Sequence, residues 1–283
     1  MRVTPSRSRA DEWAVVLAAA DVPYELRESL EGWALVVSAA DADAALDALA
    51  AYDRENAGDD PRVAPAPAAR PLTLAGVYVA LLLLAVFALT GGRAERSAWF
   101  ERGSGDATRI MAGEWWRAVT ALTLHADAPH VLGNAVAGAL LVSAVCQATG
   151  TGVGLWLVLL AGAIGNVLTA AAQRGPHVSV GASTAIFGAI GILVALRVVT
   201  PARVSLGGSR PWVVLAASVL LLVLFGTGPN VDVLAHLFGL LAGGVLGVAG
   251  ALALRRSPPA WLQALLAAAA AAAVAAAWRL AFS

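Results

Sequence analysis

Charged residues are scarce in this chain of 283 residues. Only 13% of the residues are charged, 59% are hydrophobic, and 19 basic residues balance 19 acidic ones. A soluble domain averages about 25% charged residues, so we do not expect a purely soluble globular protein. Disorder requires low hydrophobicity and high net charge, and neither is present. The balanced charge also gives no sign of the basic face that a nucleic-acid partner would require.

The sequence has one cysteine and no lysine. Cys146 is the single cysteine, which excludes an internal disulfide, a CxxC redox pair and a cysteine-based zinc site. The sequence has no HExxH motif and no Walker motif, so we expect no metal, no ATP dependence and no cofactor. Residues 103–106 superficially match the GxGD motif of intramembrane aspartyl proteases. They lie in a polar loop, and no second aspartate within a span is placed to share a proton with Asp106.

Much of the charge lies in residues 1–70. The pattern there predicts a helix, two extended segments and a second helix, over residues 10–20, 23–27, 33–37 and 41–52. We therefore expect a small soluble α+β domain over residues 1–55, followed by a Pro/Ala-rich linker over residues 56–70. Because residues 1–70 lack an apolar signal region, we expect this domain to stay in the cytoplasm.

After Arg70 the chain becomes strongly apolar. A bilayer span needs roughly 20 mostly apolar residues. Seven stretches qualify: 72–90, 130–148, 152–171, 183–200, 211–227, 233–254 and 260–281. The last is nearly all alanine, and a peripheral or unusually long soluble helix is its alternative. The fold class that we predict is an all-α polytopic membrane protein, with a core over residues 71–254 and an additional C-terminal helix within residues 255–283.

The arginines predict the orientation of the spans. Arg203 and Arg210 follow the fourth span, and Arg255 and Arg256 follow the sixth, so both loops lie on one side if the spans alternate. Cytoplasmic loops carry an excess of positive charge. We therefore expect a cytoplasmic N-terminus, and an outside C-terminus if the seventh span is real.

Polar side chains gather at the beginnings of the even-numbered spans. His130 and Asn134 begin the second span, Ser183 the fourth and His236 the sixth. Ionisable and polar groups within a span are costly and are functional candidates by default. The even-numbered spans all run from outside to inside, so these four groups lie at similar shallow depth near one face of the membrane.

A hydroxyl, a base and two donors are the set that acyl transfer requires. Ser183 is the candidate nucleophile and His236 the candidate base. His130 and Asn134 are one turn apart and can donate to an oxyanion, together with the backbone N–H of Ser183 at the start of its helix. Each role has a structural alternative, such as a helix N-cap for the serine, a buried structural histidine or hydrogen bonds between helices.

Four groups support this set or lie beside it. Gly181 allows a tight turn before the serine helix, Phe187 can stack on the His236 ring, and Gly239 begins a glycine stripe that favours close helix packing. Asp232 lies one turn before His236 and either orients it as a third member or is solvated.

Three other polar residues have structural interpretations. We expect His177 to be solvated, His125 to brace its loop and Asn166 to bond across helices. A transporter or channel would be expected to have charged residues near the middle of its spans. This sequence has almost none there.

The chain resembles the rhomboid family of intramembrane serine proteases over roughly residues 72–254. The resemblance rests on four motifs in this order: Trp116-Arg117, His130-x-x-x-Asn134, Gly181-x-Ser183 with Phe187-Gly188, and Ala235-His236-x-x-Gly239-x-x-x-Gly243. Each motif alone is weakly specific, but together, on alternate spans, they are strongly specific.

The resemblance implies a six-helix core with a Ser183–His236 dyad, an oxyanion pocket from Ser183, His130 and Asn134, and a seventh helix. It also implies that the Trp116-Arg117 segment lies partly in the outer leaflet. The implied partners are the lipid bilayer and single-span membrane proteins, cut near the outer end of their helix. We expect a multi-pass protein of the bacterial inner (cell) membrane and leave its oligomeric state open.

The sequence departs from the family at Thr184, where glycine or alanine often follows the nucleophile. A β-branched residue there would crowd the helix contact or narrow substrate choice. This departure supports the alternative that we keep, a catalytically silent rhomboid-like protein that binds transmembrane segments.

Overall fold

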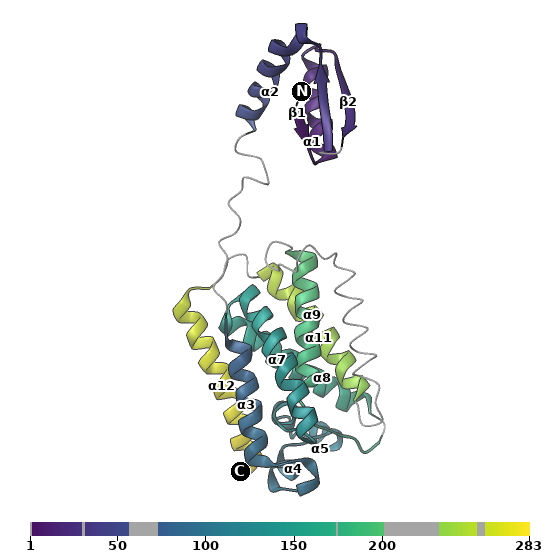
Figure 1. Ribbon diagram of the computed structural model, residues 1–283. Helices are drawn as coiled ribbons and strands as arrows, with labels where there is room; N and C mark the ends of the chain where they lie inside the picture. The colour runs from purple at the N-terminus through teal and green to yellow at the C-terminus, as the bar shows by residue number, and fades with distance from the viewer. Residues whose placement is uncertain (1, 30–31, 57–72, 174, 201–231, 254–257) are drawn as a thin grey trace. The chain divides into compact units, whose positions relative to one another are not determined.

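The computed structural model describes residues 2–29, 32–56, 73–173, 175–200, 232–253 and 258–283 (Figure 1). The chain divides into two compact units, Met1–Ala69 and Arg70–Ser283. The predicted span over residues 211–227 lies outside the described residues, as do the four arginines that we used for orientation.

The first unit is a three-stranded antiparallel sheet with two helices. Its elements are β1 (Arg2–Thr4), α1 (Arg7–Ala19), β2 (Tyr24–Ser29), β3 (Gly32–Val37) and α2 (Ala42–Glu55), and the strand order is β1-β3-β2. The predicted helix, strand, strand, helix pattern is confirmed. Strand β1 was not predicted, because three residues acquire strand geometry only by pairing with β3, where Val3 lies opposite Ala34.

The core of this unit follows from helical periodicity. Helix α1 buries Ala10, Trp13, Ala14 and Leu17, which are spaced to share one face of a helix. Trp13 and Leu17 pack in one cluster with Leu35 of β3 and with α2. The side chain of Ser6 caps α1 by accepting a hydrogen bond from the Arg9 N–H at 3.4 Å.

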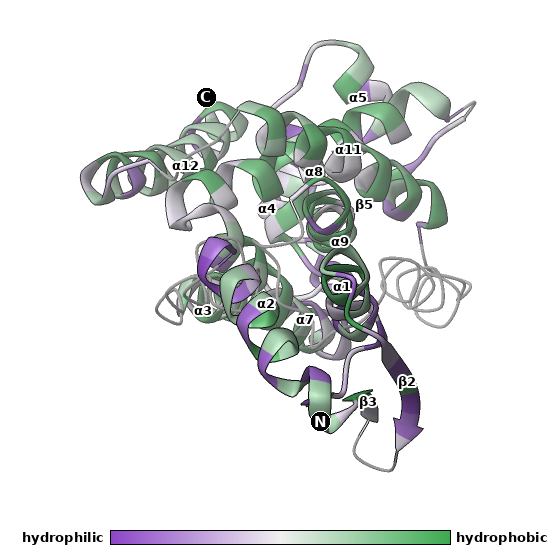
Figure 2. Cartoon of the chain, turned by 90° about the horizontal axis from the view of Figure 1, so that it is seen from above, coloured by the Kyte–Doolittle hydropathy of each residue, from purple (hydrophilic) through white to green (hydrophobic). Residues whose placement is uncertain are grey.

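The second unit is helical. Its long helices are α3 (Ala75–Thr90), α7 (Ala128–Thr149), α8 (Thr151–Ala172), α9 (Ser183–Val199), α11 (Val233–Ala253) and α12 (Ala260–Phe282). Among the described residues, five helices are long and apolar enough to cross a membrane, with α3 counted together with the short turn that follows it to Glu95, and α9 is apolar but shorter, at 17 residues. Figure 2 shows hydrophobic residues along these helices, whereas hydrophilic residues gather on β2 of the first unit. The six predicted spans that fall on described residues are all helices with nearly the predicted ends.

A folded segment connects α3 to α7. It contains α4 (Ala98–Gly103), β4 (Gly105–Asp106), α5 (Ala107–Met111) and α6 (Arg117–Thr120). Strand β4 pairs antiparallel with β5 (Val178–Ser179), which lies just before α9. This pairing ties the loop that leads into α9 to a segment distant in sequence.

Helix α9 packs against α7, α8 and α11, and its contact with α11 depends on glycine. A Cβ at Gly243 of α11 would overlap the carbonyl oxygen of Gly188, and a Cβ at Gly239 would overlap the carbonyl oxygen of Thr184. The absence of side chains here lets the two backbones approach closely, as small residues do in membrane helix packing.

Leucine in place of Gly243 is therefore expected to destabilise the protein strongly. The new side chain would meet backbone atoms of α9, which cannot move without shifting the helix, and overpacking of this kind costs about 1–3 kcal/mol or more of the free energy of unfolding. Thermal unfolding in detergent measures the effect. Gly244→Leu is the matched control, because a Cβ at Gly244 meets no atom within 4 Å. Equal losses in the two variants would contradict the packing argument.

Helix α12 is joined to the core near both of its ends. Gln263 Oε1 accepts a hydrogen bond from Val153 N at 3.0 Å, at the start of α8. At the other end, Trp278 Nε1 donates to Thr123 Oγ1 at 3.1 Å. Trp278 and Phe282 also pack edge-on against Trp99 of α4, so polar contacts and aromatic packing together position this alanine-rich helix.

Candidate active site

The predicted nucleophile and base are in hydrogen-bond contact. Ser183 is the first residue of α9, His236 lies in the first turn of α11, and Ser183 Oγ is 2.8 Å from His236 Nε2. The His236 side chain is buried, and Phe187 stacks on its ring at a centroid distance of 4.4 Å and an interplanar angle of 24°. The pair can pass the hydroxyl proton to the imidazole, as a serine nucleophile requires.

Asp232 does not act as a third member of this pair. Its Oδ1 accepts a hydrogen bond from Ala235 N at 3.1 Å, and its Oδ2 lies 2.6 Å from His177 Nε2. His236 Nδ1 is buried and has no hydrogen-bond partner among the residues that the structure describes. His177, which we expected to be solvated, instead forms this pair, with 28% of its side chain exposed.

Gly181 makes the close approach to Ser183 possible. Its φ is +125°, a conformation that residues with a side chain rarely adopt. A Cβ at this position would lie 2.7 Å from both Cε1 and Nε2 of His130. The Gly181 N–H also donates to the carbonyl oxygen of Ala121 at 2.9 Å, which fixes the turn. Glycine is thus required both by the backbone and by the adjacent histidine ring.

His130 and Asn134 lie in the first two turns of α7, at the end of the helix that the alternating direction of the spans predicts. The Nδ1 of His130 accepts a hydrogen bond from Ala126 N at 3.4 Å, so the neutral ring carries its proton on Nε2, which faces Gly181. Asn134 is buried, and its Nδ2 donates to the carbonyl oxygen of His130 at 2.8 Å. An amide nitrogen has two donors, so one N–H of Asn134 remains for a ligand.

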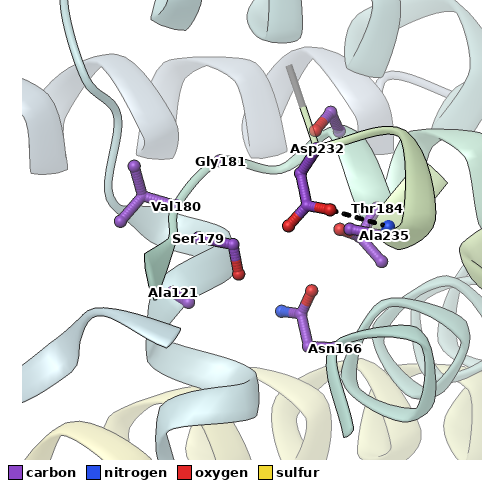
Figure 3. A pocket seen from close by; sticks show the side chains of 9 residues that line it. Ala121, Asn166, Ser179, Val180, Gly181, Thr184, Asp232 and Ala235 are labelled. Atoms are coloured by element: carbon purple, nitrogen blue, oxygen red, sulfur yellow. Dashed lines mark hydrogen bonds between the residues drawn. The ribbon is translucent and has the colours of Figure 1, made fainter. Parts of the chain in front are cut away.

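A small pocket opens beside Ser183, with room for about one water molecule. Figure 3 shows Asn166, Ser179 and Asp232 pointing into it from three different segments. The predicted bond of Asn166 across helices is confirmed, because its Nδ2 donates to the carbonyl oxygen of Ala118 at 2.9 Å. Ser179 was not predicted at this site, since only the pairing of β5 with β4 places it there.

Thr184 fits without crowding the helix contact. It is 3% exposed, and its Cγ2 occupies the space that a side chain at Gly165 of α8 would need. Gly239 of α11 lies on its other side. Two glycines from neighbouring helices thus accommodate the β-branched side chain. The concern that this departure from the family pattern disrupts packing is not supported.

Trp116 and Arg117 belong to the segment between α3 and α7. Arg117 is 2% exposed, and its guanidinium donates to Glu114 Oε2 at 2.5 Å and to the carbonyl oxygens of Glu101 and Ser104 at 3.0 and 3.1 Å. Trp116 Nε1 is buried without a hydrogen-bond partner among the described residues. Arg117 therefore holds this segment together and leaves the reacting atoms to other residues.

His125 has a structural role, as expected, but the bond it forms braces the turn before Ser183, not the loop that carries His125. It is fully buried, and its Nε2 accepts a hydrogen bond from Ala182 N at 3.4 Å. Burial lowers the pKa of His125 to about 4, so the ring is neutral at neutral pH and can accept this bond.

Comparison with known proteins identifies the family. The family model of the Rhomboid domain matches residues 112–252. The chain is 31% identical over 148 residues to "Putative rhomboid protease YdcA" of Bacillus subtilis (strain 168), covering 52% of this chain and 73% of that protein. The chain belongs to the rhomboid family. This rhomboid is also 28% identical over 179 residues to "Rhomboid protease GluP" of the same organism, covering 60% of this chain and 33% of the relative.

Membership of the family and the apolar helices together show what kind of protein this is. The protein is an integral multi-pass membrane protein and a rhomboid-type serine protease, an enzyme that hydrolyses peptide bonds. Its all-α core and small N-terminal α+β part agree with the predicted fold class.

Proposed function

We propose that this rhomboid cleaves transmembrane segments of single-span membrane proteins near the extracytoplasmic face, using Ser183 as nucleophile and His236 as base. The observation that carries the proposal is the 2.8 Å contact between Ser183 Oγ and His236 Nε2 at the beginnings of two predominantly apolar helices, α9 and α11. An ionisable pair is costly among membrane helices and is expected only where function requires it.

The reaction proceeds in two halves. The Ser183 hydroxyl attacks the scissile carbonyl carbon while His236 Nε2 accepts its proton, and the same nitrogen then protonates the leaving amine. Water next attacks the acyl-enzyme, with His236 again taking and returning the proton. The pocket that Ser183 shares with Asn166 and Asp232 has polar groups in its lining and room for about one water, which suits this second half.

The oxyanion of each tetrahedral intermediate is held by three donors. The first N–H groups of a helix lack intrahelical acceptors, and the helix dipole favours negative charge there, which suits the backbone N–H of Ser183. Nε2–H of His130 faces Gly181, two residues from Ser183, and Asn134 keeps one free donor. Such fixed donors favour the transition state because they need no reorganisation.

The side of the membrane follows from the arginine pattern. Arg203, Arg210, Arg255 and Arg256 mark one side as cytoplasmic, so the ends of α7, α9 and α11 that carry the site face outward. A bilayer core contains almost no water, so hydrolysis is favoured at this shallow depth. We place the protein in the bacterial inner membrane with a cytoplasmic N-terminus, the small domain spanning residues 1–55 and the linker residues 56–70.

Reconstitution with a reporter substrate tests the proposal. Purified protein in liposomes is expected to cut a tagged single-span protein once, and mass spectrometry of the fragments is expected to place the cut near the outward end of the span. A fluorophosphonate probe is expected to label Ser183 in the same preparation. A substrate cut in its cytoplasmic half would contradict the proposed side, and binding without cleavage or labelling would favour the catalytically silent alternative.

A further inference from the structure

His177 and Asp232 connect two segments that carry the two reacting residues. His177 lies in the loop over residues 175–182 that leads into α9, six positions before Ser183. Asp232 immediately precedes α11, four positions before His236. Their side chains meet at 2.6 Å and are 28% and 17% exposed, so solvent screens the contact only partly.

Asp232 is bound directly to the backbone of the histidine helix. Its carbonyl oxygen accepts the N–H of His236 at 3.1 Å, and its Oδ1 caps Ala235 N at 3.1 Å, the bond drawn in Figure 3. A displacement of Asp232 therefore displaces the first turn of α11, which includes His236.

The loop that contains His177 is held on its other side by the segment between α3 and α7. The carbonyl oxygen of His177 accepts a hydrogen bond from Ala107 N at 2.9 Å, and Gly181 N donates to the carbonyl oxygen of Ala121 at 2.9 Å. These backbone bonds fix the loop against that segment but do not attach it to α11. The side chain of His177 supplies that attachment.

We propose that His177 and Asp232 are positioning residues that fasten the outward ends of α9 and α11 together and so set the separation of Ser183 Oγ and His236 Nε2. The inference rests on the proposed function of that dyad. The glycine contacts of α9 and α11 set how closely the helices pack along their length. The dyad lies at the helix ends, with His236 one turn before Gly239, and the side-chain contact between His177 and Asp232 adds a link there beyond the last glycine contact.

Loss of the contact between His177 and Asp232 is expected to slow the chemical step of cleavage. A misplacement of about 1 Å between reacting groups can lower a rate by about 100-fold. Variants that lack this contact are therefore expected to have kcat lowered about 10- to 100-fold. Their KM is expected to change less than about twofold, because the substrate-binding surfaces are retained.

Four variants separate the contact between His177 and Asp232 from other roles of these two residues. His177→Ala removes the contact, whereas His177→Gln keeps an amide N–H near the position of Nε2 and is expected to restore most of the rate. Asp232→Ser keeps a hydroxyl that can cap Ala235 N but is too short to reach His177. The double variant His177→Ala/Asp232→Ser is expected to be no slower than either single variant, because both remove one contact.

A spectroscopic measurement tests this contact without any dependence on activity. The chain has four histidines, so ¹⁵N-histidine labelling in detergent gives few resonances to assign. The Nε2 resonance of His236 is expected to shift in His177→Ala and Asp232→Ser and to return toward the wild-type value in His177→Gln. Unchanged His236 resonances would overturn the proposal, even if the wild-type protein neither cleaved nor bound a probe, an outcome that would separately reject the proposed function. If the wild type is active, two kinetic results would also overturn the proposal. One is a kcat within twofold of the wild-type value in both single variants, and the other is a double variant in which the two losses multiply.

Discussion

Replacing Ser183 with alanine is expected to lower cleavage of a single-span substrate by about 10⁴-fold or more and to abolish labelling by a fluorophosphonate. The hydroxyl that forms the acyl-enzyme is lost, and the remaining donors and binding surfaces supply only the residual rate. His236→Ala is expected to have a comparable effect, since the hydroxyl then loses the imidazole to which it is hydrogen-bonded. Fragment formation over time in liposomes measures both variants.

The double variant Ser183→Ala/His236→Ala is expected to be no worse than either single variant, because the two residues act as one unit. Ser283→Ala is the control serine, since its side chain is exposed and its Oγ donates to the carbonyl oxygen of Leu280 in the final turn of α12. Cleavage at the wild-type rate in Ser183→Ala would reject the dyad, and so would undiminished cleavage in His236→Ala.

Removing the oxyanion donors is expected to give the next largest losses. His130→Ala and Asn134→Ala should each lower kcat about 100- to 1,000-fold, the range observed when one donor of such a site is lost, with much smaller changes in KM. The split arises because these donors act on charge that develops only in the transition state. Steady-state cleavage rates over a range of substrate density in the bilayer measure it.

His130→Asn is the matched variant, because it keeps an N–H donor near Gly181 and is expected to retain more activity than His130→Ala. Thermal unfolding must accompany the kinetics, since Asn134 also donates to the carbonyl oxygen of His130 within α7. A raised KM with unchanged kcat in both alanine variants would assign the two residues to substrate binding instead.

Much of the membrane unit could be predicted because lipid imposes simple rules. A span must be apolar and about 20 residues long, and its backbone must be hydrogen-bonded within the segment. The predicted span over residues 130–148 accordingly corresponds to Ala128–Thr149, and that over residues 260–281 to Ala260–Phe282. The direction of alternate spans then gathers Ser183, His130 and His236 at one face without knowledge of the packing.

The parts that could not be predicted depend on pairings between distant segments. Asp232 lies one turn from His236, and this spacing left either an orienting role or solvation open, but its carboxylate binds His177 instead. Thr184 suggested crowding, but Gly165 and Gly239 leave space for it. Strand β1 and Ser179 likewise acquire their places only from strand pairing. Local sequence spacing carries no information on these partners.

The sequence alone determined that this chain is a multi-span helical membrane protein of rhomboid type, and which serine and histidine can meet near one face. That much follows from hydropathy, span parity and motif order, which are properties read along one chain. Only the tertiary structure decided that the two residues lie within hydrogen-bond distance, that Asp232 serves a different histidine and that Thr184 is accommodated. These outcomes depend on contacts of a few ångströms between separate helices, where one missing Cβ or one loop hydrogen bond changes which side chains meet.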